Sequence, residues 1–238
     1  MRMEKLLVLV CFLAISVFAA GEDEENGVAL FIFGDSTVDP GNNNYISAVP
    51  QFRADHPPYG NNGFFEKPTG RFCEGRVVDL KKQLDQFEEL QDKLVEKLGS
   101  DEAEKLFSEA VYFLSIGSND YLGGYLANPE IQQLHPPQEY VGMVVTNVTK
   151  AIQILYSKGA RKFGNLGLSA LGCLPIMRAM ANDPNGGCLA AASAMAAAHN
   201  SALSTAFQGL ASVLPGLTIA DSNFYDFLND RLEQPSKY

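Results

Sequence analysis

Apolar and polar residues follow one another along this chain in blocks that predict strands and helices in turn. Short runs rich in aliphatic and aromatic residues predict strands at 28–33, 111–116, 162–168 and 217–220. Apolar residues recur at helical spacing over 80–98, 140–157, 189–213 and 224–232. Strands that alternate with helices indicate an α/β fold with a parallel sheet covered on both faces.

The clearest helical pattern follows a long segment dense in Gly, Pro and Asn at 39–75, which reads as loop. The apolar positions of that helix are Leu80, Leu84, Phe87, Leu90, Leu94 and Leu98. Gly99 is a typical helix end, and Ser100 is expected to cap a second, short helix from Asp101.

The first 20 residues are typical of a secretory signal peptide. Arg2 and Lys5 precede an apolar stretch from 6 to 17, and the small residues Ala19 and Ala20 suit cleavage. A membrane anchor is the alternative, but the apolar stretch is too short to span a bilayer and an acidic run follows at once. We therefore expect a secreted protein without a transmembrane anchor, with one domain over 21–238.

Charge and cysteine content narrow the picture further. The formal net charge is -10, which argues against nucleic acid as a partner because phosphate binding needs clustered Lys and Arg. Of the four cysteines, Cys11 lies in the signal, Cys173 and Cys188 flank one loop and are candidates for a disulfide, and Cys73 is left over. Asn147 begins an Asn-Val-Thr acceptor for N-glycosylation.

Two predicted strands end in polar clusters that suit nucleophilic catalysis. Gly34-Asp35-Ser36 follows the first strand, and Gly117-Ser118-Asn119-Asp120 follows the second. The carboxyl ends of parallel strands share one edge of the sheet, where ligands bind. Ser36 is thus a candidate nucleophile and the Asn119 amide a candidate oxyanion donor. Taken singly, the alternatives are a helix cap for Ser36 and a turn residue for Asn119.

Longer motifs around these clusters resemble one family, the plant GDSL esterases/lipases, which are SGNH-type serine hydrolases. The motifs span nearly the whole chain after the signal, and Thr37 replaces the leucine of the family's name. They are Phe31-Ile-Phe-Gly-Asp-Ser36, Asp39-Pro-Gly-Asn-Asn-Asn-Tyr45, Pro57-Pro-Tyr-Gly60, Thr69-Gly-Arg-Phe-Cys-Glu-Gly-Arg76, Ser115-Ile-Gly-Ser-Asn-Asp-Tyr121 and Leu171-Gly-Cys-Leu-Pro175.

The resemblance implies a flavodoxin-like, three-layer α/β/α hydrolase of the secretory pathway, apoplast or cell wall. Such an enzyme cleaves esters of lipids or other small acyl compounds and needs no cofactor and no metal. The resemblance maps the nucleophile and one backbone oxyanion donor onto Ser36, and a second donor onto the side chain of Asn119. Which ester is cleaved and whether the protein forms oligomers stay open.

The chain also departs from the family pattern at two places. The family's second block, a glycine whose amide is a third oxyanion donor, has no counterpart between Arg76 and the helix that starts near Asp79. The Asp-x-x-His block with the general base and its partner aspartate is absent as well. His56, His135 and His199 read as surface or packing residues, and Asp221 and Asp226 have no such histidine to orient.

These gaps predict a shortened gene product that lacks an internal segment and a C-terminal segment. Continuous genomic coding across Val78 and Asp79, with a natural stop after Tyr238, would contradict this hypothesis. We expect such a polypeptide to be weakly active or inactive. The alternatives are a non-catalytic secreted binding or decoy protein and a splice product without function.

Overall fold

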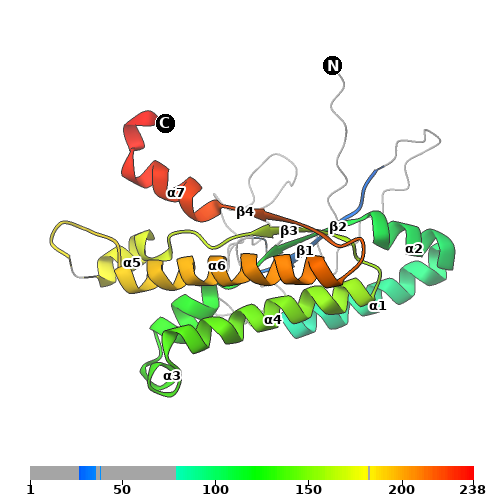
Figure 1. Cartoon of the computed structure of the whole chain (residues 1–238), viewed down its shortest axis with the longest axis horizontal. Helices are drawn as coiled ribbons and strands as arrows, with labels where there is room; N and C mark the ends of the chain where they lie inside the picture. Colours follow the sequence, from blue (N-terminus) through cyan, green and yellow to red (C-terminus); the bar gives the residue numbers. More distant parts are fainter. Residues whose placement is uncertain (1–26, 36–37, 39–78, 182) are drawn as a thin grey trace, which may run out of the picture. The chain divides into compact units, whose positions relative to one another are not determined.

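A computed structural model describes residues 27–35, 38, 79–181 and 183–238. Within these residues four strands are hydrogen-bonded neighbours in the order β1-β2-β3-β4 (Figure 1). Their bounds are β1 Leu30–Gly34, β2 Val111–Ser115, β3 Lys162–Leu166 and β4 Thr218–Ser222. Helices lie between successive strands in the sequence, so the predicted α/β class with a parallel sheet is confirmed.

The chain divides into two compact units. The first comprises residues up to Ser115 together with Ile154–Phe163, and the second comprises Ile116–Gln153 and Gly164–Tyr238. Helix α4 (Pro137–Ser157) and strand β3 contribute residues to both ranges.

The first unit is built on the parallel pair β1 and β2. Leu30 pairs with Val111 and Gly34 with Ser115, so both strands end at the same level. Helices α1 (Leu80–Leu98) and α2 (Ser100–Glu109) connect the two strands and pack on each other. This crossover is the arrangement that a parallel pair requires.

The core of the first unit is a cluster of aromatic rings. Phe31 and Phe33 alternate with partly exposed residues along β1, and both are fully buried. Phe87 of α1 is also fully buried, and its ring lies edge-on to that of Phe31 with centroids 5.1 Å apart. The cluster continues through Phe107, Tyr112 and Phe163.

Local signals set the ends of α1 as the sequence predicts. The Asp79 carboxylate accepts a hydrogen bond from the Lys82 backbone N–H at 2.8 Å, which caps the first turn. Gly99 ends the helix with φ +86°, in the region that favours glycine. One prediction is wrong: Ser100 is the first residue of α2, not its cap, because Gly99 already holds that position.

The second unit contains most of the remaining helices. Its long helix α6 (Ala190–Val213) buries one face against β4 and two short helices, the π-helix η4 (Asp120–Leu126) and η5 (Leu171–Cys173) (Figure 1). The buried positions Ala192, Met195, Ala196, His199, Leu203, Phe207 and Leu210 recur at helical spacing. The other shorter elements are α3 Pro129–Leu134, α5 Pro175–Met180, α7 Phe224–Glu233 and η6 Pro235–Lys237.

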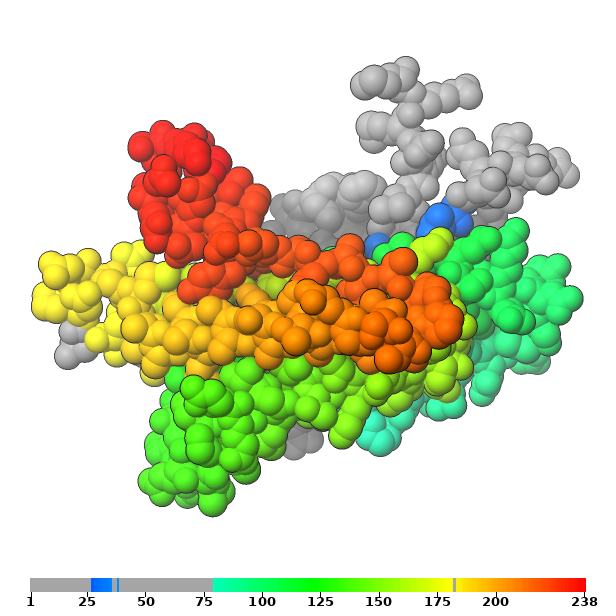
Figure 2. All heavy atoms as spheres, in the orientation of Figure 1, coloured from blue at the N-terminus to red at the C-terminus, as the bar shows by residue number. Residues whose placement is uncertain are grey.

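Helix α7 differs from α6 because it buries none of its residues. Figure 2 shows it in red with the residues that follow, standing clear of α6. Phe227 is 51% exposed and carries the guanidinium of Arg231 over its ring at 3.5 Å. The Arg231 side chain, one turn further along α7, therefore covers part of the exposed apolar ring of Phe227.

Candidate active site

The predicted nucleophile Ser36 lies outside the described residues, but the strand that leads to it does not. β1 ends at Gly34, and the Asp35 backbone N–H donates to the Ser115 carbonyl at 3.2 Å. The Val38 N–H in turn donates to the Asp35 carbonyl at 3.1 Å. The chain on either side of Ser36 is thus tied to the carboxyl end of β1 and β2.

Gln83 holds the last residue of β1 in a two-point clamp. Its Oε1 accepts from the Gly34 N–H at 3.0 Å, and its Nε2 donates to the Gly34 carbonyl at 2.9 Å. The side chain is only 3% exposed. An amide that pairs with both backbone groups satisfies them as a neighbouring strand would, so it fixes the position of the last residue of β1.

Position 34 also has no room for a side chain larger than that of glycine. An added Cβ would lie 2.4 Å from Val38 Cγ2 and 2.6 Å from the Ser115 backbone oxygen. The second atom belongs to the paired strand and has no rotamer to escape into. The Gly of the Gly34-Asp35-Ser36 motif therefore allows β1 and β2 to approach each other at the strand ends.

Asn119, the predicted oxyanion donor, lies in the second unit and is exposed to solvent. It precedes η4 and has helical backbone angles, φ −69° and ψ −33°. Gly117 opens the turn with φ +121°, and the Tyr121 N–H donates back to the Gly117 carbonyl at 3.3 Å. A π-helix directly after such a turn is a feature that recurs at functional sites.

His199 is buried beside this turn rather than exposed to a substrate. It is 1% exposed, and its Nδ1 forms a hydrogen bond with the Tyr121 hydroxyl at 2.8 Å. Burial lowers the pKa of His199 to about 4, so the ring is neutral at pH 7. A ring with this pKa is a weak proton acceptor, which agrees with its interpretation as a packing histidine.

The other histidines and the C-terminal aspartates have separate partners. His135 Nδ1 lies 2.7 Å from Glu139 Oε1, one turn further along the chain, and His56 lies outside the described residues. Asp221 accepts from Asn165 Nδ2 at 2.9 Å, and Asp226 from Asn223 Nδ2 at 2.6 Å. Among the residues that the structure describes, neither His135 nor His199 forms a hydrogen bond with an aspartate.

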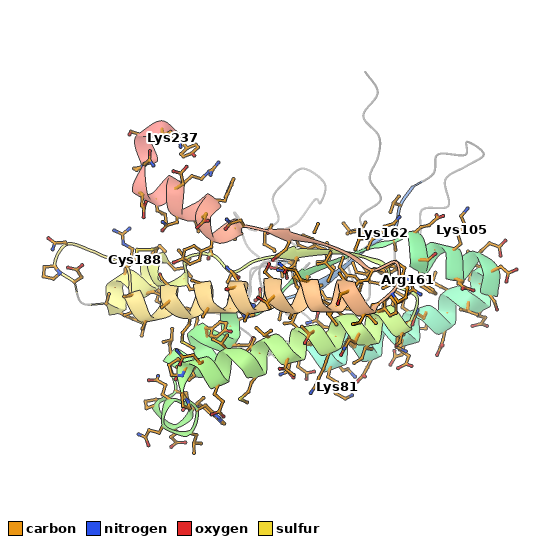
Figure 3. The ribbon with its side chains drawn as sticks, in the orientation of Figure 1. Lys81, Lys105, Arg161, Lys162, Cys188 and Lys237 are labelled. Atoms are coloured by element: carbon orange, nitrogen blue, oxygen red, sulfur yellow. A yellow bond between two sulfur atoms is a disulfide. The ribbon has the colours of Figure 1, made fainter. Side chains whose placement is uncertain are left out.

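A disulfide joins Cys173 to Cys188 in the second unit, and Figure 3 places Cys188 in the loop that leads into α6. Cys73 lies outside the described residues. Among the residues that the structure describes, no group of three or more His, Cys, Asp or Glu side chains has the geometry of a metal site. In the same residues, no helix combines the length and the hydrophobicity of a membrane-spanning segment.

Sequence patterns did not single out Gln83, although a signal exists. Gln83 stands three residues after Leu80 and four before Phe87, which places a polar side chain inside the apolar stripe of α1. A polar residue in such a stripe needs a buried partner, and here the partner is the end of β1. Asn200 likewise pairs with both backbone groups of Leu168: its Oδ1 accepts from the N–H and its Nδ2 donates to the carbonyl.

Comparison with known proteins identifies relatives over most of the chain. A family model described as GDSL-like Lipase/Acylhydrolase matches residues 30–237. The chain is 31% identical to a GDSL lipase of Tanacetum cinerariifolium, over 98% of this chain and 73% of the relative. It is also 31% identical to GDSL esterase/lipase 5 of Arabidopsis thaliana, over 90% of this chain and 68% of the relative.

These alignments are longer than the chain itself. The match to the Tanacetum lipase runs over 278 residues, and that to GDSL esterase/lipase 4 of Arabidopsis thaliana over 289, whereas the chain has 238. The relatives therefore carry residues inside the matched range that have no counterpart in this sequence.

Proposed function

The chain belongs to the GDSL-like lipase/acylhydrolase family, and from this we propose that it acts on carboxylic esters of lipids or other small acyl compounds through Ser36. The observation that carries the proposal is the family match over residues 30–237, which includes the Gly34-Asp35-Ser36 motif. The two hydrogen bonds from Gln83 to the Gly34 backbone support the proposal, because they fix the strand end that precedes the nucleophile Ser36 in the chain.

In the proposed reaction the Ser36 oxygen attacks the carbonyl carbon of the ester. The oxygen of the tetrahedral intermediate takes the negative charge, stabilised by the Ser36 backbone N–H and the Asn119 side-chain amide. The alcohol leaves, and water then hydrolyses the acyl-serine and frees the acid. We propose that solvent accepts the serine proton, since His199 is buried and bonded to Tyr121, and His135 is bonded to Glu139.

Without a general base this reaction is slow, and we propose that the 238-residue polypeptide is a weak esterase at most. A second candidate for the 238-residue polypeptide, whose sequence contains no Asp-x-x-His block, is the binding of acyl ligands without turnover. Calorimetric binding of an uncleaved ester, with no release of acid, would favour this alternative.

Added imidazole tests the assignment of Ser36. A general base contributes about 10²–10⁴-fold to such reactions, and free imidazole should restore part of that factor if a competent serine is present. We expect the hydrolysis of p-nitrophenyl butyrate by the wild-type polypeptide to rise with imidazole concentration above the rate of imidazole alone. Ser36→Ala should show only the rate of imidazole alone, and Asn119→Ala a reduced increase. Equal rates for wild type and Ser36→Ala at every imidazole concentration would refute the proposal.

We further propose that the protein is secreted and carries an N-glycan on Asn147. Asn147 is exposed on α4, so its side chain is open to solvent in the part of the chain that the structure describes. In a plant secretion system we expect the mature protein to begin near residue 21 and to lose mass on treatment with peptide N-glycosidase A, which also cleaves glycans with an α-1,3-linked core fucose. Thr149→Ala should remove that mass difference. Retention of Met1 on the exported protein, or an unchanged mass, would contradict the respective claim.

A further inference from the structure

Side chains from two helices hold the turn that presents Asn119. The Tyr140 hydroxyl of α4 donates to the Asp120 carbonyl at 3.1 Å, one residue after Asn119. The His199 imidazole of α6 bonds to the hydroxyl of Tyr121, two residues after Asn119. All of these residues lie in the second unit.

Ring packing reinforces these hydrogen bonds. The Tyr121 ring is fully buried between Tyr140, at a centroid distance of 6.1 Å, and His199, at 5.4 Å, and it meets both nearly edge-on. A Cβ added to Gly117 would lie 3.4 Å from His199 Cε1, so the imidazole lines the space beside the first residue of the turn. The turn is therefore held just after Asn119, through Asp120 and Tyr121.

The protonation states suit a permanent contact. Burial raises the pKa of the Tyr121 hydroxyl, with a further contribution from the charge of Asp120, and it therefore stays protonated. His199 is neutral at pH 7. Two neutral groups share one hydrogen bond inside the protein, where breaking it would leave buried polar atoms unpaired.

We propose that Tyr140 and His199 are positioning residues, which fix the turn from Gly117 to Tyr121 and thereby the direction in which the Asn119 amide points. The inference rests on the proposed function for its catalytic consequence. Preorganised oxyanion donors stabilise charge because they need not reorient during the reaction. Loosening the turn should lower kcat with little change in KM, since Asn119 acts on the transition state.

The chain offers a matched control in Tyr125. Its hydroxyl donates to the His135 carbonyl at 3.0 Å, and its ring packs on Tyr140 with centroids 4.7 Å apart. Tyr125→Phe and Tyr140→Phe thus each remove one hydroxyl from the same aromatic cluster. Only Tyr140→Phe removes a hydrogen bond to the turn that carries Asn119.

The experiment measures hydrogen exchange of the Tyr121 amide by NMR and the imidazole-dependent, Ser36-dependent esterase rate in the full polypeptide. We expect Tyr140→Phe and His199→Gln each to speed Tyr121 exchange at least about fivefold relative to the exchange of Asn128. We expect kcat to fall by about the same factor or more with KM nearly unchanged. Tyr125→Phe should leave both readouts within about twofold of wild type.

The two readouts separate this inference from the proposed function. A wild-type protein without any Ser36-dependent rate would refute the proposed function, while Tyr121 exchange would still decide whether the two side chains hold the turn. Unchanged Tyr121 exchange in Tyr140→Phe would overturn the inference, as would equal effects of Tyr140→Phe and Tyr125→Phe. Tyr140→Phe keeps the test decisive even if His199→Gln does not fold.

Discussion

The 238-residue polypeptide is expected to hydrolyse p-nitrophenyl butyrate at least roughly 10⁴-fold more slowly than a relative with a complete set of catalytic groups. A general base is worth about 10²–10⁴ in rate. One oxyanion donor is worth about 2.7–4 kcal/mol of transition-state stabilisation, which is a further factor of about 10²–10³. These contributions are not strictly additive, but each concerns a different charge in the transition state.

The measurement compares kcat/KM of this polypeptide with that of a family member that carries the Asp-x-x-His block and hydrolyses the same ester, under the same conditions without imidazole. Ser36→Ala is the control for contaminating esterases, which would not respond to that substitution. A wild-type rate within about a hundredfold of that family member, and abolished in Ser36→Ala, would show that some other group accepts the serine proton.

Periodicity predicted the long helices α1, α4 and α6 well because each of them buries one face. The stripe of Leu80, Leu84, Phe87, Leu90 and Leu94 gave α1 with both of its observed ends. Strand β3 ends at Leu166 rather than 168, since the Leu168 backbone pairs with the Asn200 side chain instead of a strand. The short elements η4, α3 and α5 were not predicted, because one or two helical turns contain too few positions to show a period.

Sequence motifs point to the residues that we propose to carry the chemistry, but not to the residues that support them. Ser36 and Asn119 stand in motifs that read directly from the sequence. Gln83, Tyr140 and His199 act through partners that are distant in the sequence. Gln83 is 49 residues from Gly34, and His199 is 78 residues from Tyr121. No local pattern encodes such pairs, and only the tertiary structure brings them together.

The structure adds detail to the interpretation of His199. The sequence favours a surface or packing role for this residue over that of a general base. Its burial agrees with packing, and its hydrogen bond to Tyr121 links it to the turn that carries Asn119. A histidine that never charges at neutral pH can be packed like an aromatic residue while it still satisfies a buried hydroxyl.

Replacing Phe87 by alanine is expected to cost about 3–5 kcal/mol of unfolding free energy in the first unit. The side chain is fully buried, and four aromatic rings surround it with centroids between 5.1 and 6.0 Å from its own. Those rings are Phe31, Phe33, Phe107 and Tyr112. Rigid rings on both strands and on α2 cannot collapse into the space, so a cavity remains and the loss lies toward the upper end.

Urea unfolding followed by far-UV circular dichroism measures the effect, since the chain contains no tryptophan to report by fluorescence. Val95→Ala is the matched control, because Val95 lies on the same helix but is 40% exposed, and we expect it to cost less than about 1 kcal/mol. A loss below about 1 kcal/mol for Phe87→Ala would contradict the aromatic core as the structure presents it. Because Phe33 precedes Gly34 on β1 and Phe87 lies one turn from Gln83 on α1, we expect Phe87→Ala also to weaken the imidazole-dependent reaction of Ser36. Val95→Ala should leave that reaction unchanged.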